Sequence, residues 1–250
     1  MNSGLQFNNL SVSVNSKQIL HTITLSLKPG TVHALMGPNG SGKSSLAYTA
    51  IGHPRYEVQQ GTICLNGVDI TALSPDKRAQ QQLFVAFQYP QALPGINVFS
   101  FLKETHRAFT GQQLPLEQLR IQVLEHFDTV GLDRSFLDRS VNEGFSGGEK
   151  KRFEMVQLLL HKPAVAILDE IDSGLDVDAL KSVAQALQKV RAENRSMCIL
   201  LITHYQRILD YCTPDFVHIL ADGVIARSGT AALVHEIEAK GYDAYRTREL

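Results

Sequence analysis

The sequence predicts an α/β fold with a parallel-sheet core, an antiparallel β edge and a helical subdomain. Three successive patterns along the chain indicate this class. Apolar and polar residues alternate in Leu10–Val14 and Ile23–Leu27, which is typical of half-buried strands. Residues 91–160 place apolar residues at helical spacing. Beyond residue 160, short apolar segments alternate with an amphipathic helix, a pattern that favours βαβ units and a mostly parallel sheet.

The first third of the chain contains turn and cap residues that delimit these strands. Pro29-Gly30 predicts a turn, after which Thr31–Met36 forms a buried strand that runs into a glycine-rich loop. Asn66-Gly67 indicates a hairpin. Ser74-Pro75 predicts a helix start, because serine is a favoured N-cap and proline fits the first helical position.

The middle of the chain predicts helices, and the last third returns to strands. We expect helices over about residues 99–109 and 116–130, the second between Pro115 and Gly131. Buried strands are expected at Val165–Leu168 and Cys198–Ile202, with a closing hairpin over residues 216–226. We therefore predict one domain over residues 1–250, in which residues 1–90 and 161–250 form the α/β core and 91–160 the helical subdomain.

Composition excludes several classes of protein. The 250 residues are 44% hydrophobic and carry a net charge of −1, so no global attraction to nucleic acid is expected. The longest apolar run, Met197–Ile202, is far shorter than the roughly 20 residues of a membrane span. The three cysteines, Cys64, Cys198 and Cys212, are scattered, which favours reduced thiols and a cytoplasmic location and offers no iron–sulfur ligand set. We therefore expect neither a nucleic-acid partner nor membrane insertion.

Residues 37–44 match the phosphate-binding P-loop pattern and lie between a predicted strand and a predicted helix. Glycines allow backbone N–H groups to approach phosphate, and the helix N-terminus adds its positive dipole end. We expect Lys43 to supply a cation for the terminal phosphates and the Ser44 hydroxyl to act as a Mg²⁺ ligand. The alternative, an ordinary glycine-rich turn with an exposed lysine, does not account for the match of pattern and context.

A second candidate element is the apolar strand that ends in Asp169-Glu170. Functional groups gather at the carboxyl ends of parallel strands. We expect Asp169 to hold Mg²⁺ through water and Glu170 to polarise the attacking water. Two solvated acids at a strand end are the alternative interpretation.

Residues 144–152 resemble the signature segment of the ABC-type ATPases, usually written Leu-Ser-Gly-Gly-Gln. Ser146 is expected to cap a helix while Gly147 and Gly148 expose N–H groups to phosphate. The resemblance spans nearly the whole chain. It implies the ABC-ATPase fold, Mg²⁺-dependent hydrolysis of ATP to ADP and phosphate, and a head-to-tail dimer with each ATP between one P-loop and the other chain's signature turn, Ser146–Gly148.

The family resemblance also assigns individual residues. Gln88 matches the glutamine-loop position, His204 the switch histidine, and residues 173–176 the loop that crosses to the second subunit. The implied catalytic residues are Glu170, His204, Gln88 and Lys43, and the implied Mg²⁺ ligands are Ser44, Gln88 and Asp169. The implied nucleotide-binding residues are Gly37, Pro38, Asn39, Gly40, Ser41, Gly42, Lys43, Ser44, Ser45, Val14, Ser146, Gly147, Gly148 and Glu149.

Two positions depart from the family pattern. Val14 occupies the position where the family often places an aromatic ring on adenine, and valine cannot stack. Glu149 replaces the usual glutamine and adds a negative charge near the partner's nucleotide. We expect this charge to weaken closure of the dimer unless Lys150 or Arg152 offsets it.

Several segments further resemble the SufC-type ATPase subunits of the SUF iron–sulfur cluster assembly system, among them residues 87–90, 141–152, 169–176 and 203–211. Ile171-Asp172 stands where transporter ATPases usually carry Pro-Thr. This resemblance implies docking onto soluble SufB- and SufD-like scaffold subunits through a surface near Tyr89–Phe101. The alternatives are the ATPase subunit of an ABC membrane transporter and a non-hydrolysing, ATP-gated interaction module.

Overall fold

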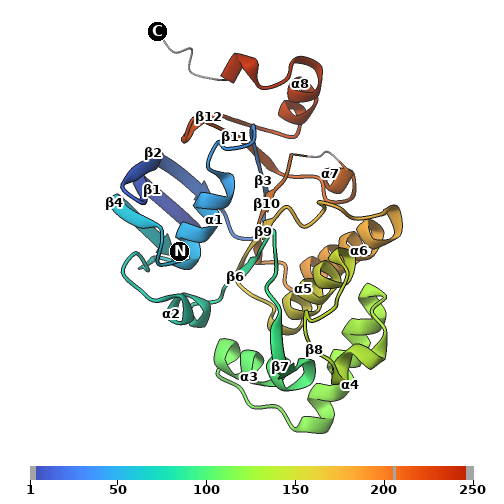
Figure 1. The fold of residues 1–250 in the computed structure, drawn as a ribbon. Helices are drawn as coiled ribbons and strands as arrows, with labels where there is room; N and C mark the ends of the chain where they lie inside the picture. The colour runs from blue at the N-terminus through green and yellow to red at the C-terminus, as the bar shows by residue number, and fades with distance from the viewer. Residues whose placement is uncertain (1–3, 205–206, 246–250) are drawn as a thin grey trace.

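The computed structural model describes residues 4–204 and 207–245, in which two sheets lie on either side of one short helix (Figure 1). The larger sheet has six strands in the order β12-β11-β3-β10-β9-β6. Its strands are β3 (Val32–Met36), β6 (Leu83–Ala86), β9 (Val165–Asp169), β10 (Cys198–Ile202), β11 (Phe216–Ala221) and β12 (Val224–Gly229). All neighbours pair in parallel except β11 and β12, which form the closing hairpin.

The predicted antiparallel edge is a separate four-stranded sheet in the order β2-β1-β4-β5. Its strands are β1 (Leu5–Val14), β2 (Lys17–Leu27), β4 (Glu57–Leu65) and β5 (Val68–Asp69). The Asn66-Gly67 turn joins β4 to β5 as expected, with Leu65 opposite Val68. Ile23, Leu25 and Leu27 are buried while the residues between them are exposed, which confirms the half-buried alternation along β2.

Helix α1 (Lys43–Ile51) fills the space between the two sheets. Its residues Leu46, Ala47 and Ala50 are buried in one cluster with apolar residues of β1, β2 and β4 and with one face of the larger sheet. The short helix α2 (Pro75–Gln80) begins after Ser74, as the sequence predicts. Because α1 is held from both sides, its N-terminus has a fixed position at the carboxyl end of β3.

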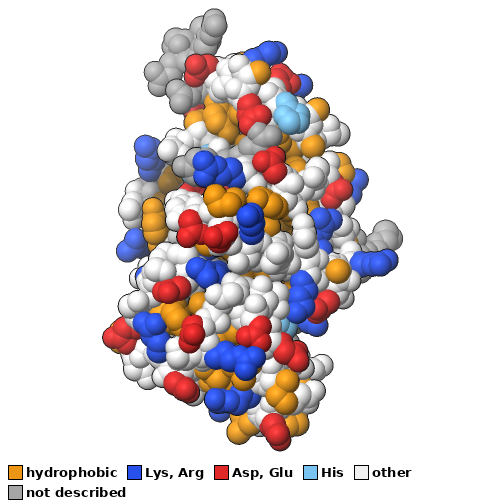
Figure 2. Space-filling view, turned by 90° about the vertical axis from the view of Figure 1, so that its right-hand side faces the viewer, with side chains coloured by type: hydrophobic (Ala, Val, Ile, Leu, Met, Phe, Trp, Pro, Cys, Tyr) orange, Lys and Arg blue, Asp and Glu red, His pale blue; other side chains and the backbone are white. Residues whose placement is uncertain are grey.

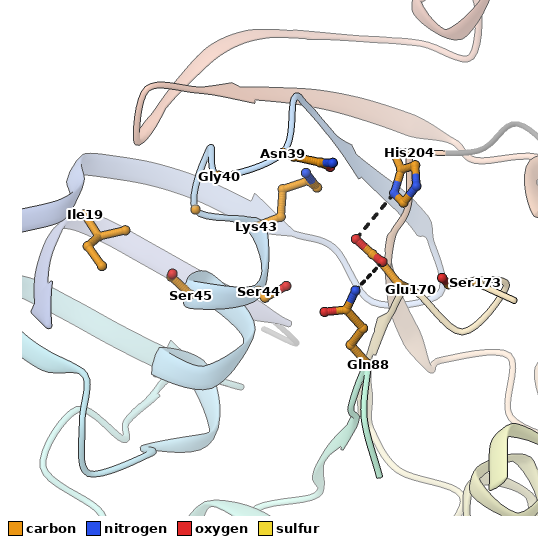
Figure 3. A pocket seen from close by; sticks show the side chains of 11 residues that line it. Ile19, Asn39, Gly40, Lys43, Ser44, Ser45, Gln88, Glu170, Ser173 and His204 are labelled. Atoms are coloured by element: carbon orange, nitrogen blue, oxygen red, sulfur yellow. Dashed lines mark hydrogen bonds and ion pairs between the residues drawn. The ribbon is translucent and has the colours of Figure 1, made fainter. Parts of the chain in front are cut away.

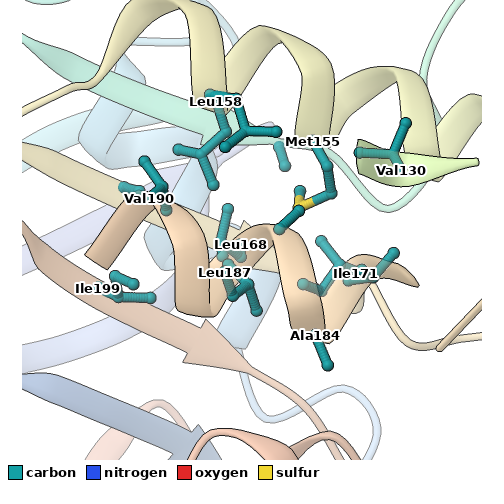
Figure 4. Packing of buried hydrophobic residues seen from close by; sticks show 14 of the residues in the cluster. Val130, Met155, Leu158, Leu168, Ile171, Ala184, Leu187, Val190 and Ile199 are labelled. Carbon is teal, nitrogen blue, oxygen red and sulfur yellow. The ribbon is translucent and has the colours of Figure 1, made fainter. Parts of the chain in front are cut away.

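On the opposite face of the larger sheet lie α5 (Gly147–His161) and α6 (Val177–Glu193) (Figure 1). Helices α3 (Val98–Thr110) and α4 (Leu116–Val130) pack on these two helices rather than on the sheet, and α7 (Arg207–Tyr211) and α8 (Ala232–Lys240) follow later in the chain. Met155 and Leu158 of α5 pack against Leu187 of α6 and Leu168 of β9 (Figure 4). The helices of residues 91–160 thus share a continuous core with the sheet.

Residues 91–160 are not entirely helical. A two-stranded sheet pairs β7 (Leu93–Asn97) with β8 (Ser140–Val141), with Leu93 opposite Val141. Two 3-10 turns, Arg134–Asp138 and Asp243–Tyr245, complete the elements. The sequence lacks a signal for the β7–β8 pair because its two strands are far apart in the chain and because β7 contains Pro94 and Gly95, which disfavour strand formation.

Two surface properties bear on the excluded classes. Lys and Arg side chains alternate with Asp and Glu side chains over the face shown in Figure 2. Over residues 4–204 and 207–245, no helix has both the length and the apolar character that a bilayer crossing requires.

Candidate functional site

The P-loop begins where β3 ends and closes at the first turn of α1. Gly42 is the N-cap of α1 and has a φ of 106°, a left-handed conformation that glycine adopts without strain. A Cβ at this position would lie 2.7 Å from Leu20 Cδ2, so a side chain would also collide with the neighbouring sheet. The α1 N-terminus carries no side-chain cap and no acidic residue in its first turn. Its first N–H groups are therefore left for an anion.

Lys43 is buried at the start of α1, and its ammonium group is held by the loop itself. Its Nζ donates to the carbonyl oxygens of Gly37 and Pro38, each at 2.9 Å. Burial lowers the pKa of Lys43, whereas the carboxylates of Glu170 and Asp169 oppose that shift. The ammonium is thus a desolvated cation that faces two acids across the cavity.

Glu170 follows β9 in a left-handed conformation, with a φ of 48°. Its carboxylate accepts a hydrogen bond from Gln88 Nε2 at 2.6 Å and lies 3.4 Å from His204 Nδ1 (Figure 3). Gln88 comes from the loop after β6 and His204 from the loop after β10. Gln88 and Glu170 are 82 positions apart in the sequence, and Glu170 and His204 are 34 apart. They meet because β6, β9 and β10 are adjacent parallel strands.

Asp169 ends β9 with a side chain that is almost completely buried. Neither carboxylate oxygen has a hydrogen-bond partner among the described residues. The Ser44 hydroxyl stands beside the carboxylate, without completing a bond of normal geometry, and works to lower its pKa. Burial dominates and raises the pKa of Asp169 to about 6. An orphaned buried carboxylate next to a hydroxyl is a donor set that fits a hard divalent cation.

A further contact joins the loops that carry Glu170 and His204. Thr203 Oγ1 donates to Asp172 Oδ2 at 2.8 Å, and both side chains are buried. Burial raises the pKa of Asp172, and the Thr203 hydrogen bond opposes that shift. Residues 205–206 of the SUF-like segment lie outside the described residues.

Several of these groups line one cavity of about 550 Å³, whereas Asp169, Asp172 and Thr203 are not among its lining residues. It is lined by nine of the predicted residues, Asn39, Gly40, Gly42, Lys43, Ser44, Ser45, Gln88, Glu170 and His204. Ser173 and Ile19 also line it. The residue that sequence reasoning missed is Ile19, because an isoleucine in an alternating strand carries no signal beyond strand formation.

Other predicted residues lie behind or away from the cavity. Gly37 and Pro38 contribute the carbonyl groups that hold Lys43, and Ser41 is buried within the loop. Val14 ends β1 opposite Lys17 and is not among the lining residues. Its contact with adenine stays a prediction.

The signature turn lies on the N-terminus of α5 and does not line this cavity. Ser146 caps the helix as predicted: its Oγ accepts from the Glu149 N–H at 3.3 Å. Glu149 Oε2 in turn accepts from the Ser146 N–H at 2.7 Å, which completes a capping box. The Glu149 charge is therefore engaged by the helix that carries it.

Known proteins resemble the chain in sequence and in fold. The family model of the ABC transporters matches residues 20–173. Vegetative protein 296 of Bacillus subtilis (strain 168) is 45% identical over 243 residues, which cover 96% of this chain and 92% of the relative. A protein of Pyropia yezoensis named "Probable ATP-dependent transporter ycf16" is 46% identical over 244 residues, 96% of each chain.

Solved structures share the fold at lower identity. The ATP-binding subunit of an ABC transporter has a TM-score of 0.80 at 23% identity and covers 95% of this chain and 94% of its own. A bacterial ABC transporter cassette in dimeric form has a TM-score of 0.78 at 19% identity, with coverage of 91% and 98%. Together with the family match and the closer relatives, these findings establish that the chain belongs to the ABC transporter family as one of its ATPase cassettes.

Proposed function

We propose that this chain binds ATP with Mg²⁺ in the 550 Å³ cavity and hydrolyses it to ADP and phosphate. The observation that carries the proposal is the meeting of Gln88, Glu170 and His204 opposite the uncapped N-terminus of α1. The N–H groups of α1 and the Lys43 ammonium bind and orient the phosphates. Glu170 then polarises the attacking water, and Gln88 and His204 fix its carboxylate.

The residues present fit a Mg²⁺ ion at Asp169. Its two buried oxygens lack partners, the Ser44 hydroxyl stands beside them, and the Oε1 of Gln88 is left over when Nε2 bonds to Glu170. Over residues 4–204 and 207–245, no group of three His, Cys, Asp or Glu residues could hold a metal. The site would thus complete its shell with water and phosphate oxygens, as Mg²⁺ sites usually do, and the ion would offset phosphate charge there.

The same proposal includes a dimer that forms on ATP. The signature turn does not line the cavity of its own chain, so a second copy is required to bring such a turn to the bound nucleotide. The dimeric cassette among the structural neighbours has the fold that such an arrangement needs. Because Glu149 is held in the capping box, its carboxylate is directed to its own helix.

For the task that ATP serves, we propose the SUF-type scaffold role. The proposal is supported by the sequence segments that resemble SufC-type subunits. One of them contains Asp172, which stands where transporter ATPases usually carry the Thr of Pro-Thr. In this chain the Asp172 side chain accepts a buried hydrogen bond from Thr203. A groove of about 570 Å³ next to Gln88, lined in part by Tyr48, Phe87, Tyr89, Pro90 and Phe101, offers an apolar surface to a partner. Tyr89 is 72% exposed there.

A transporter role is the competing proposal, because several relatives are named ATP-dependent transporters or ABC transporter ATP-binding proteins. Native purification separates the two. Capture on the tagged chain followed by mass spectrometry should recover soluble scaffold proteins in the SUF role. Recovery of an integral membrane permease that needs detergent would reject that role in favour of transport.

Hydrolysis is tested with Glu170→Gln. The amide can still accept from Gln88 but cannot take a proton, so we expect ATP affinity within about threefold of wild type and a loss of turnover of at least about 100-fold. Isothermal titration and phosphate release measure the two quantities. Lys43→Ala is the matched control and should lose ATP affinity instead. Full activity of Glu170→Gln would remove Glu170 as the base, and absent turnover in wild type would leave the non-hydrolysing module.

A further inference from the structure

The peptide backbone of Phe87, directly before Gln88, is held on both sides by one helix. Glu154 Oε1 accepts from the Phe87 N–H at 2.8 Å. Lys151 Nζ donates to the Phe87 carbonyl oxygen at 2.5 Å. Both side chains come from α5, one turn apart, and their charged groups lie 3.4 Å from each other. The N–H and the C=O of a single residue are thus fixed by two side chains of α5.

Burial of the Lys151 and Glu154 charges destabilises the folded protein. The side chains of Lys151 and Glu154 are only 5% and 6% exposed. Burial raises the pKa of Glu154 to about 7, against the opposing effects of Lys151 and of the Phe87 N–H. Removing two charged groups from water is unfavourable and is offset only where their mutual geometry is good. An apolar pair of similar size would fill the same space without that cost, so packing alone does not explain these two residues.

These contacts connect two regions that have roles in the proposed function, on which this inference rests: the loop that carries Gln88 and the signature turn. On one side, Phe87 is followed by Gln88, whose amide holds the Glu170 carboxylate at 2.6 Å. On the other side, α5 begins at Gly147 and carries the signature turn. Lys151 lies four residues into that helix, about 6 Å along its axis. One rigid helix therefore reaches both the proposed contact with the partner's ATP and the backbone beside the chain's own Gln88.

We propose that Lys151 and Glu154 are positioning residues that connect α5, the helix that begins at the signature turn, to the backbone before Gln88. Through this connection, ATP of the partner bound at the signature turn sets the position of Gln88 and Glu170 in the chain's own cavity. Neither residue touches the cavity. Their effect is exerted through the Phe87 peptide, which fixes where the Gln88 side chain starts.

The test is a double-mutant cycle in the full chain, together with any partner that copurifies with it. Glu154→Leu removes the acceptor for the Phe87 N–H, whereas Glu154→Gln keeps one. We expect Glu154→Leu to lower kcat about tenfold with the ATP dissociation constant unchanged within about threefold, and Glu154→Gln to retain at least about half of kcat. In a Gln88→Ala background, Glu154→Leu should lower kcat by less than about twofold further, because its route through Gln88 is already lost.

Arg152→Met is the matched control. Arg152 lies between the two residues on α5, but its guanidinium donates to the Gly131 carbonyl at the end of α4. This variant should not lose its effect in the Gln88→Ala background. If Glu154→Leu does not fold, Lys151→Met takes its place in the same cycle. Independent, multiplying effects of Glu154 and Gln88, or a parallel loss of ATP affinity, would overturn the inference. A wild-type chain without turnover would instead overturn the proposed function.

Discussion

At the scale of single residues, the site is built from charges that the fold buries before any ligand arrives. Lys43, Asp169 and Glu170 are each less than 9% exposed. Lys43 and Glu170 have polar partners within the chain, but the Asp169 carboxylate has none among the described residues. A buried charge without a partner destabilises a folded protein, so Asp169 points to stability given up for ligand binding.

This trade predicts that Asp169→Asn stabilises the nucleotide-free protein. The pKa of Asp169 rises from 3.8 to about 6 on folding, so the folded state resists ionisation and loses up to about 3 kcal/mol as pH rises from 3.8 through 6. At pH 8 without Mg²⁺ or ATP, the variant should unfold at higher urea, and it should lose the extra stability that Mg²⁺ with ATP gives wild type. Asp178→Asn, whose side chain is 96% exposed, is the control. Lower urea resistance of the free Asp169→Asn protein would contradict the prediction.

At the scale of elements, helices α1 and α5 both begin in a segment of glycine and serine, but their N-termini differ in whether a side chain caps them. Helix α1 has Gly42 as its N-cap, no side-chain cap and no first-turn acid, whereas α5 is closed by the capping box of Ser146 and Glu149. An uncapped N-terminus leaves several N–H donors for phosphate, while a capping box uses two of them internally. The α1 N-terminus is thus suited to bind phosphate strongly, and the α5 N-terminus keeps its turn in shape through its own side chains.

At the scale of the whole molecule, the continuous core encloses ionisable side chains away from the cavity. Burial lowers the pKa of His33, His126 and His218 to about 4 and that of His161 to about 3. In the unfolded chain these histidines bind protons at about pH 6.5. The unfolded state therefore takes up more protons as pH falls below 6.5, and the folded state loses stability.

We predict an acid-sensitive fold on this basis. The buried carboxyls with raised pKa values, Asp169, Glu154 and Asp172, work in the opposite direction. The four histidines outweigh them, which leaves a net uptake of roughly one to two protons on unfolding near pH 5 and a loss of about 2 kcal/mol per pH unit. Urea unfolding followed by circular dichroism between pH 5 and 7 measures this slope. His126→Gln should reduce it, while His235→Gln, at a side chain that is 74% exposed, should not. A flat profile over this range would contradict the prediction.

The sequence by itself determined the elements and the chemistry of the phosphate side. Short-range patterns specify a strand followed by a glycine-rich loop and a helix, and the hairpin at Asn66-Gly67, because they depend on backbone conformations that neighbouring residues set. The Ser146 cap was equally predictable, since a capping box needs only residues three apart. The acids that end β9 were placed at the site because parallel strands end on one edge.

Only the tertiary structure decided which distant groups meet. Ile19 lines the cavity because the second sheet packs on α1, and the β7–β8 pair forms between strands more than 40 residues apart. The hydrogen bonds of Lys151 and Glu154 to the Phe87 backbone likewise depend on how α5 packs against β6. Local sequence carries no record of such contacts, because they arise from the packing of elements whose order in space differs from their order in the chain.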